Sequence, residues 1–158
     1  MSDIGLYFAH ENARSSQSEM ISDGVRALSN GGFLLAAAPT GIGKTAAALA
    51  SALHSSFDNH ISPDRANIIF MTGRQTQHKI VVDTVRKINS RIPDGVPKIS
   101  LVDIIGREGM CDHVDRMTGK CDCEDGVVED SRKSRRADLR KRLLEQPQHV
   151  DWTIKYGR

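Results

Sequence analysis

Aromatic residues and long hydrophobic runs are scarce in this sequence of 158 residues. It contains four Phe, two Tyr and one Trp, so an aromatic platform for stacking nucleic-acid bases is not evident. No hydrophobic run approaches the roughly 20 residues of a membrane-spanning helix. Residues 1–16 also lack the basic segment and hydrophobic stretch of a secretory signal. These absences exclude a membrane protein and a small secreted protein, and they predict a soluble cytoplasmic protein.

Cysteine is also rare, and charge is unevenly distributed. The three cysteines all lie in residues 111–123, and such clustering in a cytoplasmic chain indicates a metal or redox site more than a disulfide framework. The net charge of +2 gives little information about partners. However, five acidic residues in 121–130 are followed by seven basic residues and one acid in 131–142. The basic block can meet an anion.

The first predicted element is an amphipathic helix at 17–30. Ile21, Val25 and Leu28 recur on one face of this segment. Ser16 is its predicted N-cap, and Glu19, three residues later, would complete a capping box.

The following segments predict strands that alternate with helices. Short apolar runs flanked by turn residues indicate buried strands, which are expected at 33–37, 67–72 and 98–103. Helices are expected at 44–55, 75–90 and 132–144. This alternation predicts an α/β fold with a parallel sheet covered by helices. Because it ends near residue 106, we interpret 1–105 as part of one α/β domain and 106–158 as a mostly helical insertion that contains the cysteines.

The most informative segment is the phosphate loop, Ala38–Thr45, with the sequence APTGIGKT. It matches the pattern G-x-x-x-x-G-K-[ST], except that Ala38 replaces the first glycine. Gly41 and Gly43 permit left-handed backbone angles, which bring N–H groups close to phosphate oxygens. Lys44 and Thr45 are the predicted catalytic residues, reaching the β- and γ-phosphates of ATP and coordinating Mg²⁺, respectively. The predicted nucleotide-binding residues of the loop are Ala38, Pro39, Thr40, Gly41, Ile42, Gly43, Lys44 and Thr45.

The carboxylates that complete an ATPase site are missing from this sequence. Hydrolysis needs a strand-borne Asp that holds Mg²⁺, usually with a Glu that positions water. Only Asp103 ends an apolar run, and Ile104 rather than Glu follows it. We therefore expect no significant ATP turnover from this chain alone.

Three motifs together resemble the XPD-type iron–sulfur helicases of superfamily 2. The phosphate loop reads A-x-x-G-x-G-K-T, as is common in superfamily 2. The stretch from Thr72 to Gln77 is similar to a Thr-Arg-Thr-x-x-Gln element that contacts single-stranded DNA. Gly106 and Arg107 precede Cys111 as in the segment that carries the first cluster ligand. The resemblance extends from about Arg14 to the end and implies the N-terminal fragment of an archaeal-like helicase with a RecA-like domain.

The resemblance also implies contacts with adenine and DNA. Gln17 falls in an Arg-x-x-Gln segment that often contacts adenine, and a free surface glutamine is the alternative. Thr72, Arg74 and Gln77 are implied DNA contacts, with the arginine one position later than in the family; the alternative is an ordinary polar helix start. Further candidate DNA-backbone contacts in the basic block are Arg135 and Arg136, and a solvated helix face paired with the preceding acids is the alternative.

Three chemistries compete for the cysteines. The resemblance implies that Cys111, Cys121 and Cys123 bind a [4Fe–4S] cluster whose fourth ligand lies in the polypeptide beyond Arg158. The family spacing is C-x-x-C, whereas Cys121 and Cys123 are separated by one residue. Zinc bound by these cysteines and His113 is an alternative, and so are three unligated thiols.

The function that these observations predict is ATP-dependent unwinding of DNA. The complete helicase would couple ATP hydrolysis to movement along single-stranded or forked DNA, in the context of DNA repair and away from membranes. This fragment is expected to be inactive alone and to need the rest of its own polypeptide. The alternative is a stand-alone P-loop module that binds nucleotide and zinc and has a regulatory or partner-binding role.

Overall fold

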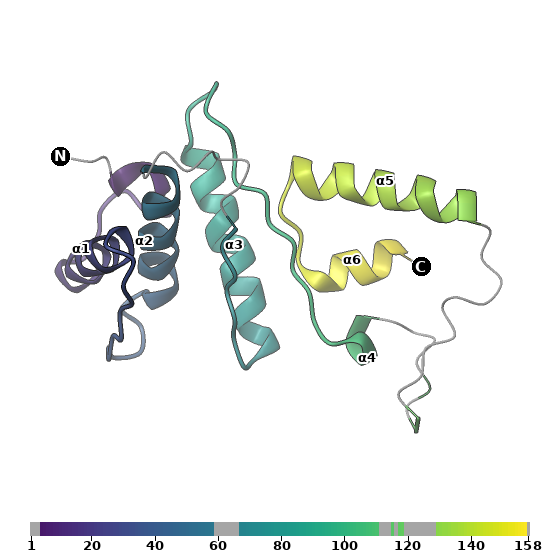
Figure 1. The fold of residues 1–158 in the computed structure, drawn as a ribbon, viewed down its shortest axis with the longest axis horizontal. Helices are drawn as coiled ribbons and strands as arrows, with labels where there is room; N and C mark the ends of the chain where they lie inside the picture. The colour runs from purple at the N-terminus through teal and green to yellow at the C-terminus, as the bar shows by residue number, and fades with distance from the viewer. Residues whose placement is uncertain (1–3, 59–66, 111–114, 116, 119–128, 158) are drawn as a thin grey trace. The chain divides into compact units, whose positions relative to one another are not determined.

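The computed structural model describes residues 4–58, 67–110, 115, 117–118 and 129–157, which form helices joined by extended segments (Figure 1). Contacts divide the chain into two compact units. The first comprises residues 1–73 and 83–98, and the second comprises 74–82 and 99–158. The helices are η1 (Ile4–Tyr7), α1 (Ser15–Ser29), α2 (Lys44–Asp58), α3 (Gln75–Arg91), α4 (Arg107–Met110), α5 (Glu129–Glu145) and α6 (Val150–Gly157). The domain division predicted at residue 105 stays a prediction. Within the described ranges, no helix is long and apolar enough to cross a membrane.

Small residues let α1 and α2 pack closely in the first unit. A side chain at Gly24 of α1 would collide with Ser51 of α2, because a Cβ there would lie 2.6 Å from the Ser51 hydroxyl oxygen. That hydroxyl donates a hydrogen bond of 2.9 Å to the carbonyl oxygen of Ala47 within α2, and it also lies 3.4 Å from the carbonyl oxygen of Ile21 in α1. The buried core beside this contact consists of Phe8, Ile21, Ala46, Ala47 and Ala50. This packing fixes α1 against the helix that begins at the phosphate loop.

Helix α1 confirms the predicted helix but differs in its cap and buried face. The helix starts at Ser15, and its N-cap is Arg14 rather than Ser16. Gln17, not Glu19, reaches back to the cap, since its Oε1 accepts a hydrogen bond from the Arg14 N–H. The buried face consists of Gln17, Ile21 and Gly24, whereas Leu28 is 40% exposed. The face turns toward Gly24 because a glycine there allows the closest approach to α2.

Helices α2 and α3 confirm the sequence prediction. Helix α2 begins at the predicted Lys44 and continues to Asp58. In α3 (Gln75–Arg91), Val81, Val85 and Ile88 recur at the spacing that predicts one apolar face, and all three are buried, at 7%, 2% and 0% exposure. The Ala-rich composition of α2, without Gly or Pro, and the apolar periodicity of α3 were sufficient guides.

The predicted parallel sheet is wrong. The segments 33–37, 67–72 and 98–103 are extended, but among the described residues they form no strand ladder. Their apolar side chains are not buried by a sheet, since Phe33 and Leu35 are 90% and 94% exposed and Ile69 is 82% exposed. A RecA-like α/β domain is therefore not seen. Apolar runs indicate a preference for burial, whereas strand pairing depends on partners distant in sequence, which the pattern does not specify.

Helices α5 and α6 contact each other in the second unit (Figure 1). The predicted helix at 132–144 lies within α5. Leu143 of α5 and Val150 of α6 are buried. Within the described parts of the chain, β-type pairing is limited to one isolated parallel bridge between Val102 and Gln148. This bridge joins the segment that precedes α4 to the segment that leads into α6.

Candidate nucleotide-binding loop

Two glycines with left-handed backbones shape the phosphate loop. Gly41 has φ 86° and Gly43 has φ 84°, and α2 begins directly afterwards at Lys44. Only glycine adopts such angles without strain. The first N–H groups of α2 have no acceptor in the preceding helical turn and carry the positive end of the helix dipole. The predicted residues of the loop thus lie together at a helix N-terminus, a geometry that suits an anion.

Lys44 is held by the carbonyl groups of its own loop. Its Nζ donates hydrogen bonds of 2.8 Å to the carbonyl oxygens of Ala38 and Pro39. Thr45 is half-buried in the first turn of α2. A phosphate is a stronger acceptor than a carbonyl because its oxygens are charged. The ammonium group is therefore close to the predicted site and has partners that a phosphate can replace.

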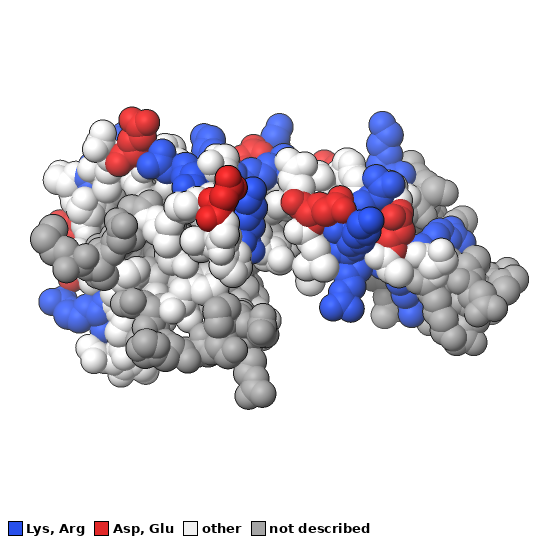
Figure 2. Space-filling model, turned by 90° about the horizontal axis from the view of Figure 1, so that it is seen from above, with Lys and Arg blue, Asp and Glu red and all other residues white. Residues whose placement is uncertain are grey.

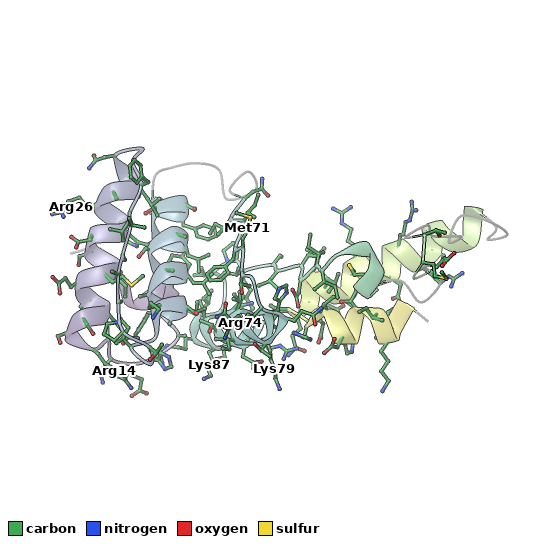
Figure 3. All side chains as sticks on the ribbon, turned by 90° about the horizontal axis from the view of Figure 1, so that it is seen from below. Arg14, Arg26, Met71, Arg74, Lys79 and Lys87 are labelled. Atoms are coloured by element: carbon green, nitrogen blue, oxygen red, sulfur yellow. The ribbon has the colours of Figure 1, made fainter. Side chains whose placement is uncertain are left out.

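Arg14 and Gln17 contact the two left-handed glycines from the first turn of α1. The Arg14 Nη1 donates a hydrogen bond of 3.0 Å to the carbonyl oxygen of Gly41. Gln17 is 5% exposed, and a Cβ added to Gly43 would overlap its side-chain nitrogen. Gln17 is therefore not a free surface residue. Figure 3 shows Arg14 at the beginning of α1 and Arg26 farther along the same helix.

Asp103 is committed to hydrogen bonds within the second unit. Its Oδ1 lies 2.6 Å from Nδ1 of His78 on α3, and its Oδ2 accepts a bond of 2.8 Å from the N–H of Val150. His149 Nε2 lies 3.8 Å from the same Oδ2. The Asp103 side chain is 8% exposed. This carboxylate thus caps the N-terminus of α6 and joins three segments that are distant in sequence.

The predicted DNA-binding element lies at the start of α3. Arg74 and Gln77 are exposed, and Thr72 is half-buried (Figure 3 labels Arg74). The N–H of Gln77 donates a hydrogen bond of 3.0 Å to the carbonyl oxygen of Arg74. Arg74 and Gln77 are accessible to a ligand, but a role in DNA binding stays a prediction.

The described basic residues of α5 are exposed to solvent. They include Arg135 and Arg136, the predicted DNA contacts, together with Arg140, Lys141 and Arg142. In the space-filling view, basic side chains alternate with acidic ones on this part of the molecule (Figure 2). No ion pair of Arg135 or Arg136 exists among the described residues. Both side chains are exposed, and their role as DNA contacts stays a prediction.

Asp138, Arg142 and Tyr156 form a polar cluster between α5 and α6. Asp138 accepts hydrogen bonds from the Tyr156 hydroxyl and from Arg142 Nε, the latter at 3.3 Å. The Tyr156 bond, followed by Arg142, lowers the pKa of Asp138 below its usual value, and the same bond raises the pKa of Tyr156. The Arg142 guanidinium lies 4.7 Å from the centre of the Tyr156 ring, which stacks on Trp152. Sequence patterns did not reveal this cluster because its members are up to 18 residues apart.

The predicted metal ligands lie outside the described residues. This holds for Cys111, Cys121 and Cys123, and also for His113, the fourth candidate for zinc. In the described ranges, no group of three or more His, Cys, Asp or Glu could hold a metal ion. The cluster and the zinc alternative therefore stay predictions.

Comparisons with family models, curated proteins and solved structures find no match for this chain. The resemblance to XPD-type helicases thus depends on its motifs, and the site depends on the loop geometry. Sequence reasoning missed the contact between Arg14 and Gly41. The Arg-x-x-Gln spacing was the one sequence feature that pointed to this region, because it places the Gln17 side-chain oxygen where it accepts a hydrogen bond from the Arg14 N–H.

Proposed function

We propose that this chain binds the triphosphate of ATP together with Mg²⁺ through the phosphate loop, as the nucleotide-binding part of an ATP-dependent DNA helicase. One observation carries the proposal: two glycines with positive φ directly precede α2, and the Lys44 ammonium lies on the same loop. Backbone N–H groups, a helix N-terminus and a lysine are the combination that cradles phosphates. The helicase part of the proposal is supported by the sequence motifs alone, since the described residues do not form the parallel sheet of the RecA-like domain that the resemblance implies.

Binding would exchange the partners of Lys44. Its ammonium group would leave the carbonyl oxygens of Ala38 and Pro39 and pair with β- and γ-phosphate oxygens. The Thr45 hydroxyl would coordinate Mg²⁺. Asp103 already uses both carboxylate oxygens, so we expect this chain to bind ATP without efficient hydrolysis.

Titration of ATP and Mg²⁺ against Lys44→Ala tests the phosphate site. Loss of a charged hydrogen bond is worth about 1.5–3 kcal/mol, so the dissociation constant should rise roughly 10- to 100-fold. Lys87→Ala is the matched control, because Lys87 is an exposed lysine of the first unit on α3. Equal affinity of both variants, or no ATP binding by the wild-type chain, would contradict the proposal.

The variant Thr45→Ala separates the contribution of Mg²⁺ to ATP affinity from the contribution of the phosphate contacts. If the hydroxyl coordinates Mg²⁺, the variant should bind ATP more weakly than wild type with Mg²⁺ present. The difference should disappear in EDTA, since no metal remains to be coordinated. A loss of affinity that is the same in EDTA would assign Thr45 a structural role instead.

DNA binding by α5 is tested with a fluorescent oligo-dT. Double charge reversal, Arg135→Glu with Arg136→Glu, should weaken binding and reduce its dependence on salt, because fewer counterions are released. The control is Lys87→Glu with Arg91→Glu, which reverses two exposed charges on α3. If both double variants bind DNA equally well, the DNA contact does not lie on α5.

The proposed metal is tested independently of nucleotide. A [4Fe–4S] cluster on Cys111, Cys121 and Cys123 with one further ligand should give anaerobically purified protein a broad absorbance at about 400 nm. Stoichiometric zinc in a colourless protein would support the zinc alternative. No step of the nucleotide proposal depends on either metal.

A further inference from the structure

The first turn of α1 is bound to both left-handed positions of the phosphate loop. Arg14 donates to the carbonyl oxygen of Gly41, and Gln17 packs against Gly43. The rest of α1 is anchored on α2 through Ile21 and through the contact between Gly24 and Ser51. The loop is therefore held from the side of α1 as well as from its own helix.

The orientation of the Gln17 amide follows from its partners. The Arg14 N–H can only donate, so the amide atom that faces it at 3.0 Å must be the oxygen. The nitrogen then faces Gly43, where it occupies the space of an absent Cβ. With 5% of the residue exposed, this side chain has one end bonded to the helix cap and the other packed against the loop.

We propose that Gln17 is a positioning residue that holds the phosphate loop, so that it sets affinity for the triphosphate whichever base is attached. The inference deepens the proposed function and depends on it. Substituting a residue that contacts adenine would lower the affinity for ATP and leave the affinity for a triphosphate without adenine unchanged. A residue that acts through the loop affects every ligand that carries the same phosphates, including a triphosphate with no base.

The test compares ATP, GTP and inorganic tripolyphosphate, each with Mg²⁺, on wild-type protein and on Gln17→Ala. Loss of one neutral hydrogen bond corresponds to roughly a 3- to 10-fold loss of affinity, and this factor should be equal for the three ligands. A loss for ATP with unchanged tripolyphosphate affinity would overturn the inference and assign Gln17 to the base. Unchanged affinity for all three ligands would also overturn it.

Two further variants exclude a general effect on folding. Asn30→Ala removes an amide that caps the opposite end of α1, where its Nδ2 donates to the carbonyl oxygen of Arg26; it should leave all three affinities unchanged. Gln17→Glu keeps an oxygen for the Arg14 N–H but turns a carboxylate toward the loop, so all three ligands should bind more weakly than to wild type. A Gln17→Glu loss confined to ATP would contradict loop positioning. If wild-type protein binds none of the ligands, the proposed function itself fails.

Discussion

Replacing Asp103 should destabilise the second unit without changing the affinity for ATP. Its carboxylate caps α6 through the Val150 N–H and bonds to His78, while 8% of the side chain is exposed. Loss of a helix cap costs about 0.5–2 kcal/mol, and loss of a buried hydrogen bond to an ionic group costs about 1.5–3 kcal/mol. We expect Asp103→Ala to lower the free energy of unfolding by about 2–5 kcal/mol.

A second substitution divides this cost between its two parts. Asp103→Asn retains a carbonyl oxygen that can accept from the Val150 N–H, but it removes the negative charge beside His78. Its cost should be smaller, about 1 kcal/mol. Asp151→Asn is the control, because it makes the same chemical change at a side chain that is 83% exposed, and it should cost less than about 0.5 kcal/mol.

The assay is urea unfolding followed by the fluorescence of Trp152, the single tryptophan, which lies on α6. Equal losses for Asp103→Ala and Asp103→Asn would refute the capping argument, and so would a loss below about 0.5 kcal/mol for both. ATP titrations with and without Mg²⁺ complete the test. If Asp103→Asn preserves stability but removes the Mg²⁺-dependent part of ATP affinity, Asp103 is a metal carboxylate and our interpretation of its bonds is wrong.

Three further predictions concern the loop, the polar cluster and the core of α2. Gly41→Ala should cost about 1–2 kcal/mol of stability for its positive φ, and Gly43→Ala about 1–3 kcal/mol more for the collision with the side chain packed against it; equal urea midpoints would contradict this. Tyr156→Phe should raise the lowered pKa of Asp138 toward its usual value, as followed by carboxyl ¹³C NMR. Because the pKa of Asp138 is lower in the folded state, this carboxylate stabilises the protein above the ordinary carboxyl pKa, and the stabilisation is lost as pH falls through the folded-state pKa. In Tyr156→Phe the free energy of unfolding should therefore fall less between neutral and acidic pH than it does in wild type. Ser55→Ala should raise the unfolding free energy by about 0.5–2 kcal/mol, because the buried hydroxyl has no hydrogen-bond partner among the described residues and alanine favours a helix; a lower urea midpoint would show that the hydroxyl is bonded.

Local chemistry was enough to predict α1, α2, α3 and α5 and the backbone of the glycine-rich loop, whereas η1, α4 and α6 were not predicted. The start of α2 at Lys44 follows from a glycine-rich turn that leads into an Ala-rich segment without Pro or Gly. The positive φ angles of Gly41 and Gly43 follow from the same few residues. These features depend on neighbours within one or two turns of the chain, so the residue order contains the information that fixes them.

Contacts distant in sequence were beyond the reach of such patterns. The apolar run at 33–37 predicted a buried strand, yet Phe33 is 90% exposed and no ladder forms in the described chain. Asp103 looked like the end of a strand, and its actual partners lie 25 and 47 residues away. Pairing and burial are decided by which surfaces meet, and hydrophobicity along one segment does not specify the second surface.

The two Arg-x-x-Gln segments show which features the sequence alone determines and which depend on the tertiary structure. Gln17 and Gln77 each follow an arginine by three residues, and in both cases the glutamine N–H donates to that arginine's carbonyl oxygen at the start of a helix. The sequence by itself determined this local geometry. Only the tertiary structure made the two residues different, because α1 packs on α2 and buries Gln17 against Gly43, whereas Gln77 is exposed. The physical reason is that a helix start is encoded by a few adjacent residues, while the burial of its side chains depends on the helix that packs against it.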